Sequence, residues 1–214
     1  MKQIDLMVFD FDGTLVNSGG DIVASVNYTL KNLGIPMMEP EAIIGFVGDG
    51  VQKLIERSLG HDFQDQFDEV MKIFTAYYAE HMLDTTTSYT GVLDILQHFH
   101  DKKKVIITNK RYRFTRAIAE ALNIEKYFDD IIGADSTPYR KPDPRLLSPL
   151  LERFGAGCER TVVIGDGVND ILLARTTGVL SCAFLNGLGR SDVLLAQRPD
   201  FVCENLSELR SLFC

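Results

Sequence analysis

Residues 4–14 read IDLMVFDFDGT, a short apolar run that ends in two aspartates, a glycine and a threonine. A run of this length without alternation of apolar and polar residues is typical of a strand that is buried on both faces. Gly13 allows the chain to bend sharply directly after the strand. We therefore expect Asp10 and Asp12 on an exposed turn at the carboxyl end of a buried strand.

Similar short runs recur along the rest of the chain, separated by segments with apolar residues at helical spacing. The further strands are predicted at residues 105–108, 131–133, 162–165, 182–185 and 201–203. The helical segments between them include residues 114–122, 144–154 and 168–176. Strands that alternate with helices in this way predict an α/β fold with a doubly wound parallel sheet.

A long, mostly helical stretch interrupts this alternation after the first strand. Helical patterns cover residues 21–33, 51–59 and 63–83, and the last of them is predicted as one long amphipathic run. We expect residues 1–15 and 87–214 to form the α/β core, and residues 16–86 to form an inserted helical cap domain. Tyr77 and Tyr78, in the longest cap helix, are expected to pack rather than to bind a ligand.

Composition limits the class of protein. The chain has 214 residues, of which 45% are hydrophobic, enough for one core domain with a modest insertion. Its net charge of −8 argues against nucleic acid and anionic membranes as partners. The N-terminal apolar run is too short for a signal peptide or a membrane span, and the four cysteines show no CxxC spacing. We expect a cytoplasmic monomer or homodimer.

Polar residues follow three of the predicted strands. Besides Asp10 and Asp12, the strand at 105–108 ends in Thr108-Asn109-Lys110, and the strand at 162–165 is followed by Asp166 and Asp170. In an open α/β sheet the ligand lies beyond the carboxyl ends of the strands, so these residues are expected to meet.

Four carboxylates in one crevice repel one another unless a cation or protons neutralise them. Oxygen ligands select a hard ion, and Mg²⁺ commonly shares its coordination shell with a substrate phosphate. The sequence therefore predicts a Mg²⁺ site formed by Asp10, Asp12, Asp166 and Asp170. A dinucleotide-binding loop is not expected at residues 165–170, because Asp170 stands where its third glycine would be, and no GxxxxGK[ST] motif is present.

The order of these motifs resembles the haloacid dehalogenase superfamily. Its members carry DxDG[TV], then a Ser or Thr, then a Lys and then GDxxxD, and here these are DFDGT, Thr108, Lys141 and GDGVND. The resemblance spans nearly the whole chain. It implies a Rossmann-like core with a cap and phosphoryl-transfer chemistry that depends on Mg²⁺.

The resemblance also implies roles for individual residues. Asp10 would be the nucleophile that becomes an aspartyl phosphate, and Asp12 the general acid and then base. Thr108, with Asn109 beside it, would bind a phosphoryl oxygen, and Lys141 would bridge the phosphate and the nucleophile.

Further positions complete this set. Asp166 would ligate Mg²⁺ directly, and Asp170 would act through water or orient the other ligands. Gly13 and Thr14, which complete the first motif, are expected at the phosphate.

The segment 46–57 is similar to the cap loop and helix of phosphoglycolate phosphatases. The backbone at Gly48 could offer NH groups to an anion. Lys53 and Arg57 lie four residues apart and either offer a cation to a carboxylate-bearing substrate or form a solvated helix face. The sequence departs from this subgroup at Thr90 and Arg111, where proline is usual.

These observations predict a phosphatase that acts on a small phosphorylated metabolite, with phosphoglycolate as the leading candidate. A phosphosugar mutase of the same superfamily is the alternative enzyme, and a phospho-accepting signalling domain is the alternative of another class. A dehalogenase is disfavoured because Asp12 is present, and a signalling receiver is disfavoured by the inserted cap.

Overall fold

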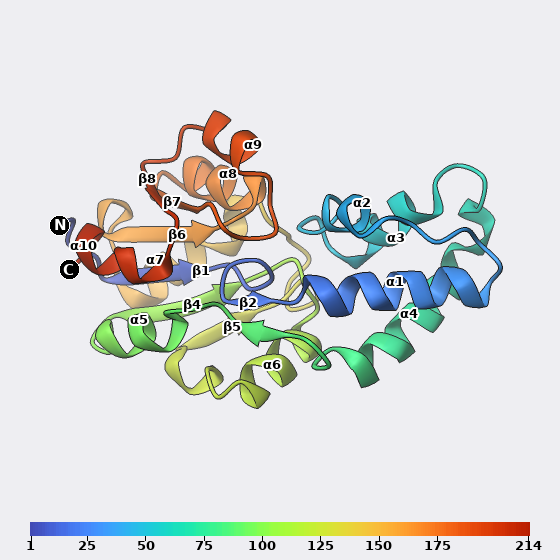
Figure 1. Cartoon of the computed structure of the whole chain (residues 1–214). Coiled ribbons are helices and arrows are strands. Elements are labelled where there is room, and N and C mark those ends of the chain that lie inside the picture. Colours follow the sequence, from blue (N-terminus) through green and yellow to red (C-terminus); the bar gives the residue numbers. More distant parts are fainter.

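Six parallel strands form the central sheet of the protein, in the spatial order β5-β4-β1-β6-β7-β8 (Figure 1). The computed structural model describes all residues, 1–214. The strands are β1 (Leu6–Phe9), β4 (Lys103–Ile107), β5 (Asp130–Ile132), β6 (Thr161–Gly165), β7 (Leu180–Phe184) and β8 (Phe201–Cys203). The α/β fold with a parallel sheet expected from the sequence is confirmed, and β1 lies between β4 and β6.

Both faces of β1 are buried because helices cover the sheet on either side. Met7 and Phe9 belong to the larger core cluster, whereas Leu6 and Val8 belong to the cluster on the opposite face. The first face is covered by α5 (Val92–His98), α6 (Tyr112–Ala121) and α10 (Leu209–Leu212). The second is covered by α7 (Ser148–Phe154) and α8 (Val168–Thr177), while α9 (Ser191–Ala196) packs near the edge. This double cover explains the unbroken apolar runs of the strands.

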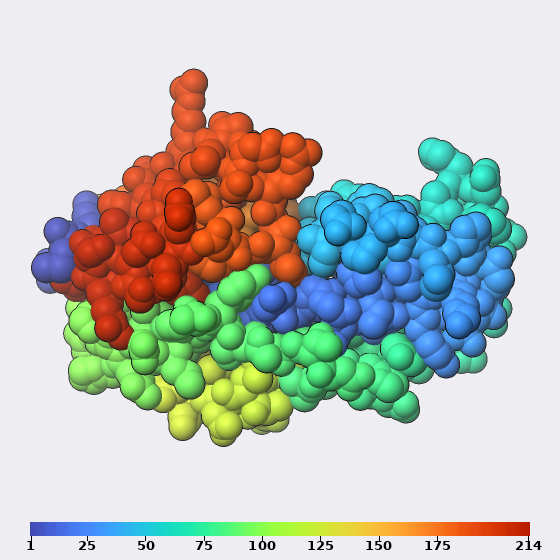
Figure 2. Space-filling model, in the orientation of Figure 1, coloured from blue at the N-terminus to red at the C-terminus, as the bar shows by residue number.

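The helical insertion forms a separate lobe beside the core, as Figure 2 shows. Its elements are α1 (Gly19–Asn32), α2 (Pro40–Ile44), α3 (Val51–Leu59) and α4 (Phe67–His81). They enclose an apolar cluster of their own, to which Phe114 of the core helix α6 also contributes. The chain leaves and re-enters the core through two short strands, β2 (Val16–Asn17) and β3 (Thr87–Ser88), which pair antiparallel.

Three local features were not predicted from the sequence. The two crossings between core and cap contain the paired strands β2 and β3, because two chains side by side can satisfy each other's backbone groups. The long run at 63–83 is broken into a 3₁₀ turn at Gln64–Gln66 and the helix α4. The short helix α2, which begins with Pro40 in its first turn, was not predicted.

The ends of the chain lie together at the side of the core that faces away from the cap (Figure 1). Lys2 and Phe213 form an isolated bridge there. The two termini are therefore remote from the edge of the sheet where β1, β4 and β6 end beneath the cap.

None of the helices combines the length and the apolar character that a membrane crossing would need.

Candidate active site

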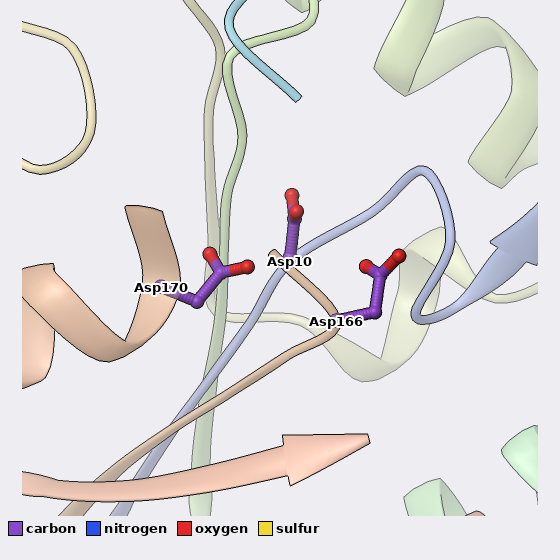
Figure 3. A group of neighbouring side chains, drawn as sticks. All are labelled: Asp10, Asp166 and Asp170. Atoms are coloured by element: carbon purple, nitrogen blue, oxygen red, sulfur yellow. The ribbon is translucent and has the colours of Figure 1, made fainter. Parts of the chain in front are cut away.

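Three buried carboxylates meet at the carboxyl ends of the neighbouring strands β1 and β6. Asp10 directly follows β1, Asp166 directly follows β6, and Asp170 lies in the first turn of α8. One oxygen of each lies within 4.8 Å of the others, and Figure 3 shows the three side chains around a common space. Parallel pairing of β1 with β6 brings these residues together, although about 150 positions separate them in sequence.

The electrostatics of this group suit a divalent cation. Burial, followed by repulsion from the Asp10 carboxylate, raises the pKa of both Asp166 and Asp170 above the usual range. Such shifts mean that the negative charges are not fully compensated by the surrounding protein. Oxygen ligands of this kind match the preference of hard cations such as Mg²⁺ or Ca²⁺. The donor set therefore fits a divalent metal.

Glycines let the backbone approach the carboxylates closely. Gly13 has a φ of +86°, and a Cβ atom at this position would lie 2.1 Å from Asp166 Oδ2. A Cβ atom on Gly165 would lie 2.2 Å from the Cγ atom of Asp170. Any side chain at either position would displace a carboxylate, so both glycines are part of the construction of the site.

The carboxylate of Asp166 is held by donors from two loops. Thr14 Oγ1 donates to Asp166 Oδ1 at 2.8 Å, and the backbone NH groups of Leu188 and Gly189 donate to Oδ2 at 2.9 and 3.0 Å. Thr14, expected at the phosphate, thus braces Asp166 in this structure. The loop after β7 was not identified from the sequence, and its Gly-Leu-Gly pattern at a strand end was the available signal.

Lys141 supplies the positive charge at the centre of the group. Its Nζ atom lies 2.7 Å from Asp10 Oδ1 and 2.6 Å from Asp170 Oδ1, and the side chain is 2% exposed. Burial alone would lower the pKa of this lysine, but Asp10 and Asp170 outweigh burial and raise it. Lys141 is therefore a fixed cation beside Asp10.

Thr108 and Asn109 are buried at the carboxyl end of β4. The Asn109 side chain bridges two loops: Nδ2 donates to the Gly48 carbonyl at 2.9 Å, and Oδ1 accepts from the Lys141 backbone NH at 3.0 Å. Asn109 therefore joins the cap loop at Gly48 to the loop that carries Lys141. The Thr108 side chain borders the cavity described below.

The Asp12 carboxylate does not join the three-carboxylate group, although the sequence placed it among the metal ligands. It accepts hydrogen bonds from Ser18 Oγ at 2.5 Å and from Lys110 Nζ at 2.9 and 3.1 Å. Lys110 Nζ also lies 2.5 Å from the Tyr78 hydroxyl of the cap. Burial tends to lower the pKa of Lys110, but Asp12 and Tyr78 raise it above its usual value.

Sequence reasoning missed the structural roles of Ser18, Lys110 and Tyr78. Lys110 stands two residues after Thr108 at the carboxyl end of a strand, which was a usable signal. Tyr78 packs in the cap as expected, against Phe74 and Phe114, but its hydroxyl also reaches the core. Burial raises the pKa of Tyr78 to about 12, against the opposing effect of the Lys110 ammonium, so the phenol stays neutral.

A cavity of about 660 Å³, partly open to solvent, lies between the core edge and the cap. Asp10, Asp12, Thr108, Asn109 and Lys110 line it from the core. The cap side chains that line it are Ile22, Val47, Val51, Leu54, Phe74, Thr75 and Tyr78, and the backbone at Gly48 and Gly50 completes the wall. The cap surface of the cavity is therefore mostly apolar.

The two cap cations named from the sequence do not line this cavity. Lys53 pairs with Glu56 at 2.6 Å, and Arg57 pairs with Asp49 at 2.5 Å, with all four side chains well exposed. Arg111 of the core does line the cavity and has no ion-pair partner. The cation that is available to an anionic substrate group is thus Arg111 of the core. Position 111 is also one of the two where the chain departs from the subgroup pattern.

Comparison with known proteins agrees with this geometry. The family model described as haloacid dehalogenase-like hydrolase matches residues 7–184. Phosphoglycolate phosphatases from Vibrio parahaemolyticus and Chromobacterium violaceum are 31% and 32% identical, over 97% and 99% of this chain and 95% and 97% of their own. A crystal structure from Haemophilus somnus, described as a predicted phosphoglycolate phosphatase, is 26% identical, with a TM-score of 0.93 and 99% of each chain covered.

The family match extends from β1 to the end of β7 and thus includes the cap and every strand end that carries a site residue. The curated relatives are similar to this chain over nearly its full length, so the similarity is not restricted to the core. The chain therefore belongs to the haloacid dehalogenase-like hydrolase family, and within it to the phosphoric monoester hydrolases of the phosphoglycolate phosphatase-like subgroup.

Proposed function

We propose that this enzyme is a Mg²⁺-dependent phosphatase that hydrolyses a small phosphate monoester through an aspartyl phosphate on Asp10. The observation that supports the proposal most directly is the convergence of Asp10, Asp166 and Asp170 around a space that Lys141 borders. A nucleophilic carboxylate, a cation site and a fixed ammonium are the groups that in-line phosphoryl transfer requires.

The first chemical step forms a bond between an Asp10 oxygen and phosphorus while the bond from phosphorus to the leaving alcohol breaks. Asp12 gives a proton to the departing oxygen, which leaves as a neutral alcohol. In the second step Asp12 takes a proton from a water molecule that attacks the phosphorus, and inorganic phosphate and free Asp10 result. Thr108 and Lys141 would bind the phosphoryl oxygens in both steps.

Asp10, Asp166 and Asp170 are the residues that would hold the Mg²⁺ ion. When bound, the ion supplies charge neutralisation for the phosphoryl oxygens during transfer. Asp12 is left out of the ligand set because its carboxylate is occupied by Lys110 and Ser18.

Residues 16–86 act in this proposal as a cap that covers the core of residues 1–15 and 87–214. An apolar wall opposite the nucleophile favours transfer of the phosphoryl group to Asp10 in the first step, and the cavity is partly open to solvent, which supplies the water of the second step. The acidic chain, with its net charge of −8, acts on a small phosphorylated metabolite in the cytoplasm.

Phosphoglycolate is the leading substrate candidate, since the curated relatives carry the name phosphoglycolate phosphatase. The carboxylate of phosphoglycolate would pair with a cationic side chain that lies apart from the groups that bind its phosphate. Arg111 suits this role because it lines the cavity with Asp10 and has no acidic partner. Lys53 and Arg57 are already paired outside the cavity.

The test is release of inorganic phosphate from phosphoglycolate and other small esters, with and without Mg²⁺. Asp10→Asn should lower kcat by roughly 10³-fold or more, because amides do not form the acyl phosphate. Retained turnover in purified Asp10→Asn would contradict the proposal. Preferred transfer of the phosphoryl group from a sugar bisphosphate to a sugar, over transfer to water, would indicate the mutase alternative instead.

A further inference from the structure

The Asp12 carboxylate is held by contacts from separate parts of the chain. Ser18 Oγ, at the entry to the cap, donates to Oδ1 at 2.5 Å, and Lys110 Nζ reaches Oδ1 and Oδ2 at 2.9 and 3.1 Å. The Lys110 and Asp12 side chains are 7% and 13% exposed. Little water is available to replace these contacts if one of them is lost.

Lys110 is in turn held by the cap. Its Nζ atom donates to the hydroxyl oxygen of Tyr78 on α4 at 2.5 Å and lies 4.7 Å from the centre of the tyrosine ring. An ammonium group has three protons, and here they serve the two Asp12 oxygens and the Tyr78 oxygen. The side chain of Lys110 is flexible in itself, so its position depends on these partners.

Tyr78 can act as a rigid support. It is 2% exposed, and its ring packs against Phe74 at 5.5 Å and Phe114 at 5.2 Å between ring centres. Phe74 lies on the same cap helix, whereas Phe114 lies on the core helix α6. The hydroxyl therefore comes to its place only while α4 is seated against the core.

We propose that Tyr78 is a positioning residue that acts through Lys110 to hold the Asp12 carboxylate in place for proton transfer to the leaving alcohol. This inference rests on the proposed function, in which Asp12 is the general acid. Proton transfer depends strongly on the placement of the acid relative to the departing oxygen. The contact from Tyr78 to Lys110 to Asp12 links that placement to the seating of the cap, so leaving-group protonation is efficient when the cavity is covered.

The neighbouring residue Tyr77 provides a matched control. It lies on the same helix but stacks on Tyr28 and His81, with ring centres 3.7 and 4.0 Å apart, and does not line the cavity. Removal of its hydroxyl changes the cap to the same chemical extent without touching Lys110.

The experiment compares kcat/KM of the Mg²⁺-loaded enzyme for esters whose leaving groups differ in their need for a proton. p-Nitrophenyl phosphate releases a stable phenolate, whereas 2-hydroxyethyl phosphate must release an alkoxide or a protonated alcohol. Tyr78→Phe should lower kcat/KM about tenfold for 2-hydroxyethyl phosphate and less than about twofold for p-nitrophenyl phosphate. Tyr77→Phe should change neither value by more than about twofold.

Lys110→Met tests the same link from the core side and should give a larger split between the two esters. Equal losses for both esters in Tyr78→Phe, or no loss for either, would overturn the positioning role. A split in Tyr77→Phe as large as in Tyr78→Phe would also overturn it. If the unaltered enzyme releases phosphate from no ester at all, the proposed function itself is wrong, and the role of Tyr78 falls with it.

Discussion

The two walls of the cavity are built from different chemistry. The core wall presents charged side chains, among them Asp10, Asp12, Lys110 and Arg111. Asp10 also belongs to the buried group that it forms with Asp166, Asp170 and Lys141. The cap wall presents apolar side chains such as Val51, Leu54 and Phe74. Buried charges require fixed partners, which a sheet edge can supply from several strands at once, whereas an apolar wall needs only packing. In the proposed function the core carries the reaction, and the cap shapes the space for the leaving group.

The difference extends to the way the two walls are joined. Several polar side chains cross between the core and the cap, and some of them reach residues of the candidate site. Asn109 and Asn169 of the core donate to Gly48 and Asp49 of the cap, and Tyr78 of the cap meets Lys110 of the core. Seating of the cap is thus coupled to the loops that carry the site residues.

After Asp10→Asn, the largest effect is expected from a change to another carboxylate of the buried group in the core. Asp166→Asn removes one negative charge from the three-carboxylate group and should lower kcat by at least about 100-fold and weaken Mg²⁺ binding by a similar factor. Initial rates over a Mg²⁺ titration, together with calorimetric binding of the ion, measure both quantities. An unchanged Mg²⁺ affinity would remove Asp166 from the ligand set.

An intermediate effect is expected at Arg111, the unpaired cation of the core wall. Arg111→Gln should lower kcat/KM for phosphoglycolate about 10- to 100-fold, because a charged hydrogen bond to the carboxylate is lost. For 2-hydroxyethyl phosphate, which has a neutral hydroxymethyl group in place of the carboxylate, the change should stay below about threefold.

Arg113→Gln is the matched control for this experiment, because Arg113 lies on the same helix over the Phe114 ring and does not line the cavity. Losses of kcat/KM of similar size for both esters in Arg111→Gln would show that Arg111 does not bind the substrate carboxylate.

The smallest effect is expected from the cap cations. Lys53→Gln and Arg57→Gln should each change kcat/KM for phosphoglycolate by less than about twofold and stability by under about 1 kcal/mol, since exposed ion pairs contribute little. Steady-state kinetics and thermal unfolding measure these changes. A loss of kcat/KM above about tenfold in either variant would mean that the cap also binds the charged group of the substrate. The contrast between the two walls would then not hold.

Much of the fold could be predicted because the responsible signals are local. The apolar run of β1 and the helical spacing of α6 are visible in a few consecutive residues. The break between Phe63 and Phe67 was missed, because a 3₁₀ turn continues the same apolar spacing. The pairing of β2 with β3 was missed because each strand has only two residues and their contact joins distant parts of the chain.

The candidate site divides in the same way. Asp10, Asp166 and Asp170 stand in recognisable motifs, and the structure brings them together. The partner of Asp12 was not predictable from its motif, because Lys110 reaches it from the end of another strand and is itself held by Tyr78 of the cap. Lys53 and Arg57 share the spacing of a helix face, but in the structure they pair with Glu56 and Asp49 and do not line the cavity.

By itself, the sequence determined most of the order of strands and helices, the presence of a helical insertion and the motifs whose residues we propose for phosphoryl chemistry. Each of these follows from residues that are adjacent or regularly spaced in the chain. The tertiary structure alone decided which carboxylates lie together, that Asp12 stands apart from them with Lys110, and that Arg111 rather than Lys53 or Arg57 lines the cavity. Such contacts join side chains far apart in sequence, and their geometry exists only when the sheet edge and the cap are packed together.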